Sequence, residues 1–265
     1  MLWPLVRKTI RDHWKLTIAW LAGLVLMATA ELWAYTFMAK AGPGAQQFIE
    51  SFPESMRKMF RMEEYFSGPG FLGTELFSFM VQLSFIAIAS SFGAAATAGE
   101  EDRGTADVLF SLPVRRAQVL ASKLIAMLIA LTTTGIVFIA FLWLTMPLAD
   151  MQAAIANVAA ATFNCAMLGL VCGSCALLVG ALTGKRGLAL GVAIGVAIAS
   201  FLIYSLAPMI DALDTVVNIV PWQWAMGADP LNHGLHAPHV ALLLGSATLL
   251  IAAAAAVFGK RDLAS

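Results

Sequence analysis

The chain has 265 residues, of which 60% are hydrophobic and 12% are charged, and its mean hydropathy is +0.82. A water-soluble domain of this length does not have that composition, so the sequence predicts an integral membrane protein. Sixteen Lys and Arg residues balance sixteen Asp and Glu residues, which excludes the broad basic field that binding to nucleic acid requires.

The first fifteen residues predict an amphipathic helix at the membrane interface. At 100° per residue Trp3, Val6, Ile10 and Trp14 form one stripe, and charged residues fill a different arc. Tryptophans beside an apolar stripe, with basic residues opposite, are typical of a helix that lies on lipid; the alternative is a plain charged leader. The residues expected at the interface are Trp3, Arg7, Lys8, Arg11 and Trp14.

Six apolar stretches are long enough to cross a bilayer, whose core of roughly 30 Å needs about 20 helical residues. They cover residues 16–38, 76–98, 119–143, 155–182, 188–210 and 240–258. The predicted fold class is therefore all-α, a polytopic membrane protein with six transmembrane helices. No repeat, low-complexity tract or linker divides the chain, so we expect residues 1–265 to form a single transmembrane domain.

The first stretch carries two further signals. Glu31 is the clearest ionisable side chain within the six stretches, and such side chains are costly in lipid and usually functional, so Glu31 is a candidate for an intramembrane role. Ala28-Thr29-Ala30 follows a basic start and also fits a signal-peptide cleavage site. The apolar run continues to Met38, which favours a first span that is retained.

Small and polar residues within the stretches predict close helix packing. Small residues at four-residue spacing let helix backbones approach one another in lipid, and amide side chains there form interhelical hydrogen bonds. The glycines with this spacing are Gly169 and Gly173, and Gly187, Gly191 and Gly195; the amides are Gln82 and Asn164.

The connection between the second and third stretches, residues 99–123, predicts a short helix of its own. Thr105 can cap a helix whose first turn includes Asp107, and Pro113 ends it. An acidic cluster precedes this helix, and Arg115 and Arg116 follow it. A rigid helix held below the membrane between two spans is a suitable lever for a soluble partner, whereas the alternative is a capped polar connector.

The basic residues predict the orientation, because cytoplasmic loops carry the excess of Lys and Arg. All but four of the sixteen lie at the termini or near the connections that follow the second and fourth stretches. The other side holds only Lys40, Arg57, Lys58 and Arg61. We therefore expect a multi-pass protein of the inner (plasma) membrane with both termini in the cytoplasm.

Catalytic and metal-binding signals are weak. The heptapeptide from Gly180 to Arg186, GALTGKR, has the wrong spacing and the wrong last residue for a phosphate-binding loop. Cys172 and Cys175 lie in an apolar stretch with no charged neighbour to stabilise a thiolate. A metal site is a weak candidate, because in a helix only the first two of three histidines share a face; these are His233, His236 and His239.

The connection after the second stretch resembles the signature cytoplasmic loop of ABC-2 type transporter permeases. In that family an acidic residue, Gly-Thr, an acidic residue, an apolar pair and Pro-Val-x-Arg recur between the second and third spans. The matching residues are Glu101, Gly104, Thr105, Asp107, Leu109, Pro113 and Arg115. The chain departs from the pattern at Ala106-Asp107 and at Phe110. Elsewhere the resemblance rests on the six spans, the amphipathic start, the large first external loop and Pro221-Trp222.

The resemblance implies a transport subunit that is not an enzyme. In such transporters two permease subunits, identical or related, associate, and each loop helix sits in a groove of a separate cytoplasmic ATPase that binds ATP and Mg. No cofactor is then expected in this chain, and the matching residues become the ATPase-coupling residues. We favour export of an amphiphilic or hydrophobic substrate, and a lipid-linked product or a peptide antibiotic fits equally well. The alternatives are an ion-coupled secondary transporter centred on Glu31 and a membrane scaffold without transport activity.

Overall fold

The computed structural model of the chain describes residues 2–41, 51–53, 57, 65, 67–99 and 115–260. The regular elements in these residues are all helices. Six are long and apolar enough to cross a membrane, which confirms the predicted fold class. They are α1 (Leu2–Ala41), α5 (Met80–Thr97), α8 (Arg116–Thr145), α9 (Ile155–Thr183), α10 (Arg186–Leu206) and α13 (Ala237–Lys260).

Short helices connect the long ones: α4 (Gly68–Glu75), η2 (Met146–Ala149), η3 (Ala207–Met209), η4 (Asp211–Leu213), η5 (Val217–Ile219), α11 (Pro221–Met226) and α12 (Pro230–His233). Their boundaries follow from local chemistry. Ser67 caps α4 by accepting a 3.0 Å hydrogen bond from the Gly70 amide. Pro221 and Pro230 occupy the first turn, where a helix needs no amide donor. Gly184, at φ 68°, ends α9 in a left-handed conformation.

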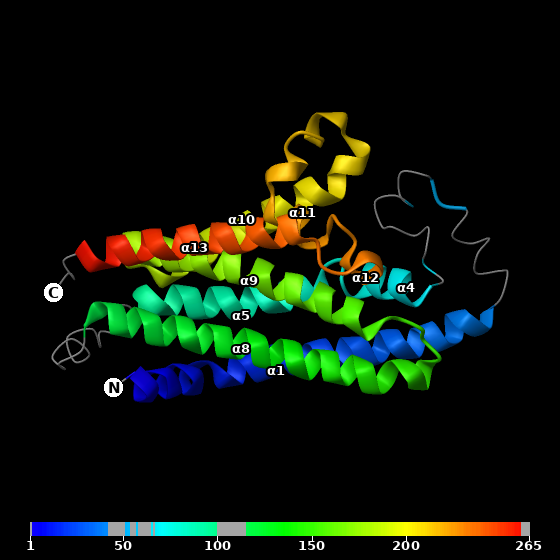
Figure 1. Cartoon of the computed structure of the whole chain (residues 1–265), viewed down its shortest axis with the longest axis horizontal. Helices are drawn as coiled ribbons and strands as arrows, with labels where there is room; N and C mark the ends of the chain where they lie inside the picture. Colours follow the sequence, from blue (N-terminus) through cyan, green and yellow to red (C-terminus); the bar gives the residue numbers. More distant parts are fainter. Residues whose placement is uncertain are drawn as a thin grey trace.

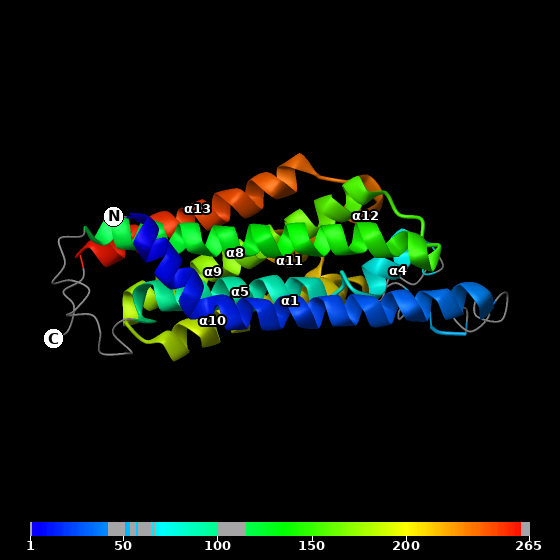
Figure 2. The same ribbon diagram turned by 90° about the horizontal axis from the view of Figure 1, so that it is seen from below.

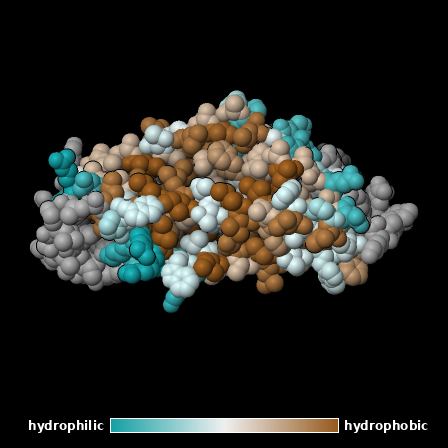
Figure 3. All heavy atoms as spheres, turned by 60° about the horizontal axis from the view of Figure 1, so that its bottom comes forward, coloured by the Kyte–Doolittle hydropathy of each residue, from teal (hydrophilic) through white to brown (hydrophobic). Residues whose placement is uncertain are grey.

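The long helices form an elongated bundle whose two ends differ (Figure 1). Both termini lie at one end, which also holds the end of α5 and the start of α8. We call it the terminal end. The other end, the distal end, holds α4, α12 and the C-terminal part of α1. On the face seen in Figure 3, hydrophobic residues cover the middle and most hydrophilic residues lie toward the two ends, as expected for a bundle that crosses a membrane.

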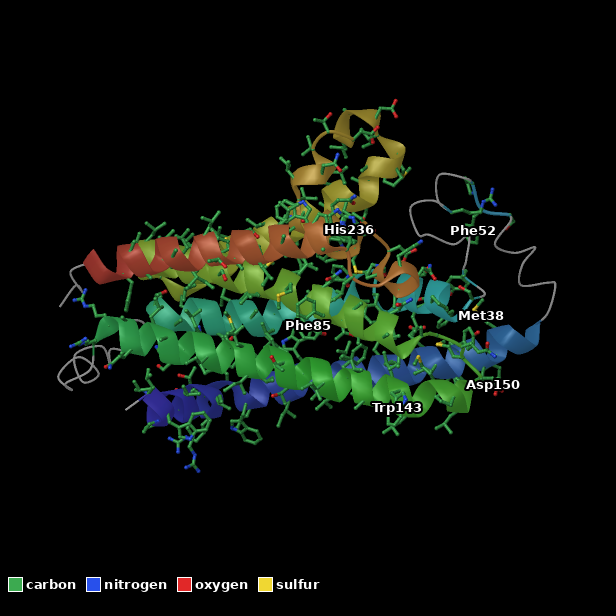
Figure 4. All side chains as sticks on the ribbon, in the orientation of Figure 1. Met38, Phe52, Phe85, Trp143, Asp150 and His236 are labelled. Atoms are coloured by element: carbon green, nitrogen blue, oxygen red, sulfur yellow. The ribbon has the colours of Figure 1, made fainter. Side chains whose placement is uncertain are left out.

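Helices α5 and α9 form the centre of the bundle, because glycine lets their backbones touch. A Cβ atom on Gly169 would lie 2.8 Å from the carbonyl oxygen of Phe85, and one on Gly173 would lie 2.8 Å from that of Ala89. The Phe85 side chain is fully buried, whereas Trp143 on α8 points outward (Figure 4). The predicted packing role of the glycines is thus confirmed for α9.

The glycine row of α10 behaves differently. A Cβ atom on Gly187, Gly191 or Gly195 would meet nothing within 4 Å in the described chain. Helix α10 packs on the bundle through the opposite face, which buries Ala189 and Ala193. Equal spacing in the sequence therefore has two outcomes: one glycine row closes the core and the other faces outward.

Helix α1 joins the predicted interfacial helix and the first span without a break. Its N-terminal part lies at an angle to the remainder (Figure 2). Leu24, Ala28 and Leu32, at four-residue spacing, are buried in the main hydrophobic core. Cleavage after residue 30 would remove two of these three core residues, so the packing agrees with a retained first span.

The second span begins later than its hydropathy suggested. Residues 76–79 form a turn between α4 and α5, and α5 starts at Met80 instead of Leu76. The side-chain amide of Gln82 donates a hydrogen bond to the carbonyl oxygen of Phe77, which the turn leaves without a helical partner. Gln82 therefore satisfies the backbone of its own segment, and the interhelical bond expected of it is replaced by this local one.

The two glycine rows make a testable prediction. Gly173→Ala should lower the free energy of unfolding by about 1–3 kcal/mol, because the new methyl group collides with the Ala89 carbonyl of the facing helix. Gly191→Ala should leave the stability of the monomeric chain unchanged or raise it, since alanine favours a helix and meets no atom of the described chain. Thermal unfolding in one detergent would compare them; equal destabilisation by both would contradict the close contact of α5 with α9.

Candidate functional site

The predicted coupling connection emerges from the terminal end. Six of its seven predicted residues lie outside the described residues: Glu101, Gly104, Thr105, Asp107, Leu109 and Pro113. The seventh, Arg115, is exposed and caps α8, and its amide donates a 3.2 Å hydrogen bond to Gln118 Oε1. The described helix ends on either side show how the connection is attached to the bundle.

The end of α5 is attached to two neighbouring helices. Thr97 Oγ1 donates a 3.1 Å hydrogen bond to the Leu177 carbonyl of α9. Lys123 of α8, whose side chain is only 9% exposed, donates a 3.2 Å bond from Nζ to the Ala95 carbonyl of α5. These bonds join the last turn of α5 to both α8 and α9.

The start of α8 is attached to the last span. The Arg116 guanidinium donates a 3.3 Å hydrogen bond to the Phe258 carbonyl near the end of α13. Beside this bond, Leu120 of α8 and Phe258 are buried in one hydrophobic cluster. Both helix ends from which residues 100–114 emerge are thus held by side chains that reach across to another helix.

The N-terminal helical turns lie against the same region. Val6, Thr9 and His13 are buried, and the His13 ring stacks on Phe92 of α5 at 4.4 Å between ring centroids. Lys8, Asp12, His13 and Lys123 contribute to a small pocket between α1, α5 and α8. The segment that precedes the first span is therefore in contact with the helices that carry the coupling connection.

The predicted apolar stripe of this segment is divided in the structure. Val6, at 1% exposure, faces the bundle, whereas Trp3 and Trp14 are 68% and 48% exposed. The basic side chains Arg7, Lys8 and Arg11 are also exposed. Exposed tryptophans beside basic residues suit a helix that contacts lipid headgroups, so the interfacial role stays a prediction, but Val6 does not belong to the exposed stripe.

Glu31 lies on α1 toward the distal end, near a second carboxylate. It interacts electrostatically with Glu75 of α4 and with Tyr65. The Tyr65 hydroxyl donates a short hydrogen bond to Glu75 Oε1. The pKa of Tyr65 is raised, first by burial and then by this hydrogen bond, so the phenol stays protonated and remains a donor at neutral pH. Sequence reasoning missed Glu75 because it lies outside the apolar stretches.

Polar contacts attach α11 and α12 to α9 near the distal end. Asn164 Nδ2 donates a 2.9 Å bond to the Ala225 carbonyl of α11, which confirms its expected interhelical role. Asn157 Nδ2 donates 3.0 Å bonds to the carbonyls of Leu231 and Asn232. These side chains hold the irregular segment that precedes α13 against the N-terminal part of α9.

The three histidines are not arranged as the sequence suggested. His233 ends α12, Gly234 turns the chain at φ 74°, and α13 begins at Ala237. The turn brings the ring of His236 to 4.5 Å from that of His239, measured between centroids, whereas a continuous helix would have put His233 and His236 on one face. Figure 4 labels His236. Within the described residues no group of three His, Cys, Asp or Glu side chains is placed to hold a metal ion.

The attachment of α5 by Lys123 is testable. Lys123→Met keeps the aliphatic packing but removes a charged hydrogen bond of about 1.5–3 kcal/mol, so amide hydrogen exchange in the last turn of α5 should become at least tenfold faster. Ser122→Ala is the matched control, because Ser122 bonds only to Val119 of its own helix in the bonds described here. Exchange that is no faster than in the control would show that Lys123 does not hold α5.

A comparison with known families identifies the chain. The profile of the ABC-2 family transporter proteins matches residues 3–263, which includes all six long helices nearly to their ends. Neither a curated protein nor a solved structure matches the chain. A match over nearly the whole length agrees with the six membrane-spanning helices. The chain belongs to the ABC-2 transporter family and is a membrane protein of that family.

Proposed function

We propose that this chain is the permease subunit of an ATP-driven exporter, forms the substrate path and is driven by a separate ATP-binding subunit. The observation that carries the proposal is the attachment of the α5–α8 connection. Both of its flanking helix ends are bonded across the bundle, through Lys123 and Arg116, within a chain that matches the ABC-2 family. No catalytic role is proposed for this chain, and ATP and Mg belong to the partner.

The connection is well placed to move the centre of the bundle. It follows α5 directly, and α5 packs on α9 with backbone contact at Gly169 and Gly173. Helices in such contact cannot slide independently, because a packed interface is not continuously deformable. A push on residues 101–113 therefore shifts α5 and α9 together. The proposed coupling residues remain Glu101, Gly104, Thr105, Asp107, Leu109, Pro113 and Arg115.

Orientation and location belong to the same proposal. Both termini lie at the terminal end, together with the end of α5 and the start of α8, which flank the coupling connection, and the sequence segments at this end carry most of the basic residues of the chain. By the positive-inside rule we expect this end to lie in the cytoplasm, and the inner membrane is the location that we propose for the chain. The distal end, with Glu31, Glu75, α4 and α12, then faces outward. The apolar spans favour an amphiphilic substrate that leaves at that side.

The coupling proposal is tested with the complex purified from its native membrane in mild detergent. We expect an ATPase subunit of near-stoichiometric yield and vanadate-sensitive ATP hydrolysis. Asp107→Asn should lower the stimulated hydrolysis about tenfold, since one charged contact is worth about 1.5–3 kcal/mol. Gly104→Leu should lower it as well, and membrane insertion should be unchanged in both variants. Lys185→Gln, an exposed change at the same end, is the control. Unaltered stimulation of ATP hydrolysis in both coupling variants would contradict the proposal that the α5–α8 connection couples the chain to the ATPase.

The second permease subunit is placed at the outward face of α10. Three glycines there, Gly187, Gly191 and Gly195, have open space within 4 Å, and small residues at this spacing permit close approach of a second helix in lipid. In a variant without native cysteines, Gly191→Cys should form a disulfide-linked dimer upon mild oxidation in membranes. Gly245→Cys, on α13, is the matched control, because Gly245 is equally open. Equal cross-linking of both positions would disprove this placement.

Ion-coupled transport is the second candidate function. The proximity of Glu31 to Glu75 and Tyr65 favours it, because two neighbouring carboxylates can share a proton. The purification described above distinguishes ATP-driven transport from ion-coupled transport. Recovery of the chain alone, without ATP hydrolysis, would favour ion coupling through Glu31 or a scaffold role.

A further inference from the structure

A lobe of short helices stands off the bundle between α10 and α11. It comprises residues 207–220, which include η3, η4 and η5, and it projects sideways from the long axis of the bundle in Figure 1. Its short helices contact chiefly one another and the adjoining ends of α10 and α11. Every residue of the lobe is described, and of these only Ala207 and Val220, at its base, are buried.

The base of the lobe is closed by contacts that fix its direction. The Trp222 amide of α11 donates a 2.9 Å hydrogen bond to Ser200 Oγ of α10, and both residues are buried. The Trp222 ring packs against Phe201 of α10 at 5.0 Å between ring centroids. Within the lobe, the Asn218 carbonyl accepts a 2.7 Å bond from the Trp224 indole. The lobe is therefore a shaped element on a fixed base, and the side chains that it exposes keep a defined position.

The length of α10 indicates the level of the lobe in the membrane. Its 21 residues extend about 32 Å at about 1.5 Å per residue, which matches a hydrocarbon core of about 30 Å. Helix α10 begins at Arg186, directly after the exposed Lys185, so its first turn lies at the headgroup level of one leaflet. The lobe follows the last turn and therefore lies at the headgroup level of the opposite leaflet, nearer the distal end.

The lobe exposes aliphatic side chains, for which contact with water is unfavourable. They are Met209, Ile210, Val216 and Ile219, of which Ile219 is the most exposed, at 69%. Leu202, which is exposed near the end of α10, connects them with the apolar surface that this span presents to the membrane. The exposed apolar surface of the lobe thus continues a surface that is already in contact with lipid.

Polar side chains limit how deep the lobe can lie. Asp211, Asp214 and Thr215 are exposed among the aliphatic residues, and a carboxylate is costly within hydrocarbon. An element that carries both kinds of side chain is suited to the membrane interface, where the aliphatic groups reach the acyl chains and the carboxylates stay among the headgroups.

We propose that the lobe inserts its exposed aliphatic side chains into the phospholipid leaflet nearer the distal end. Phospholipid is the occupant of this surface, because the lobe lies at the headgroup level and continues the apolar surface of a span. The lobe then fixes the depth of α10 and α11 in the bilayer. This inference rests on the chain crossing a membrane, and it is independent of the ATPase partner, the substrate and the direction of transport.

The test is fluorescence quenching of the full chain in phosphatidylcholine nanodiscs. In a variant without native cysteines, Ile219→Cys or Asp214→Cys is labelled with the fluorophore NBD. We expect the label at position 219 to lose most of its fluorescence when the lipid carries a nitroxide on its acyl chain, and to resist iodide added to the water. The label at position 214, the matched control, should show the reverse order.

Three outcomes would overturn the proposal. Quenching of position 219 by iodide alone would show that the lobe stands in water. Protection of this position from both quenchers would show that a second copy of the chain covers it. Equal quenching of positions 214 and 219 by the nitroxide lipid would show that the aliphatic side chains are not selectively inserted.

A second pair of variants tests the insertion itself, with the label at Met209→Cys. Ile219→Asp should remove most of the quenching by the nitroxide lipid, because a carboxylate at this position draws the lobe back toward the headgroups. Thr215→Asp, an exposed change in a polar part of the lobe, is the control and should keep the quenching. Thermal unfolding checks that both variants fold. Equal quenching in the two aspartate variants would also contradict the insertion of Ile219.

Discussion

The backbone contact between α5 and α9 is the constraint on which the rest of the bundle depends. Without side chains at Gly93, Gly169 and Gly173, two apolar helices approach more closely than large residues allow. In lipid there is no hydrophobic force between helices, so this close van der Waals packing must supply the association. The other spans then pack around the pair, and α10 and α13 contact α9 mainly with one face each.

Within the part of the chain that the structure describes, several hydrogen bonds between helices lie near the ends of the bundle. Thr97, Lys123 and Arg116 bond across helices at the terminal end. Asn157 and Asn164 do so toward the other end. Many hydroxyl groups within the spans bond instead to a carbonyl of their own helix, for example Thr162 to Val158. The middle of the bundle is thus held by close van der Waals packing, while polar contacts hold the irregular segments on either side.

The sequence predicted the spans well and their contacts less well, for a physical reason. A membrane span is recognised by the length and apolar content of one segment, and neither depends on the neighbouring helices. The six spans can therefore be predicted from the sequence. The start of α5 was misplaced because the turn at residues 76–79 is as apolar as the helix that follows. Glycine spacing could not reveal that Gly173 faces a helix and Gly191 does not. Lys123 and Arg116 were recognised as basic residues, but their acceptors lie on other helices, which no local pattern indicates.

The turn before α5 has a consequence for how the length of this helix matches the thickness of the membrane. With 18 residues, α5 is about 27 Å long at about 1.5 Å per residue, whereas the 30 residues of α8 extend about 45 Å. Helix α5 is therefore slightly shorter than a hydrocarbon core of about 30 Å, and the neighbouring helices extend beyond it. Because its neighbours shield α5 from lipid, this mismatch does not deform the bilayer. The turn at residues 76–79 therefore lies within the length that the neighbouring helices span, and α5 ends there in irregular backbone that these helices surround.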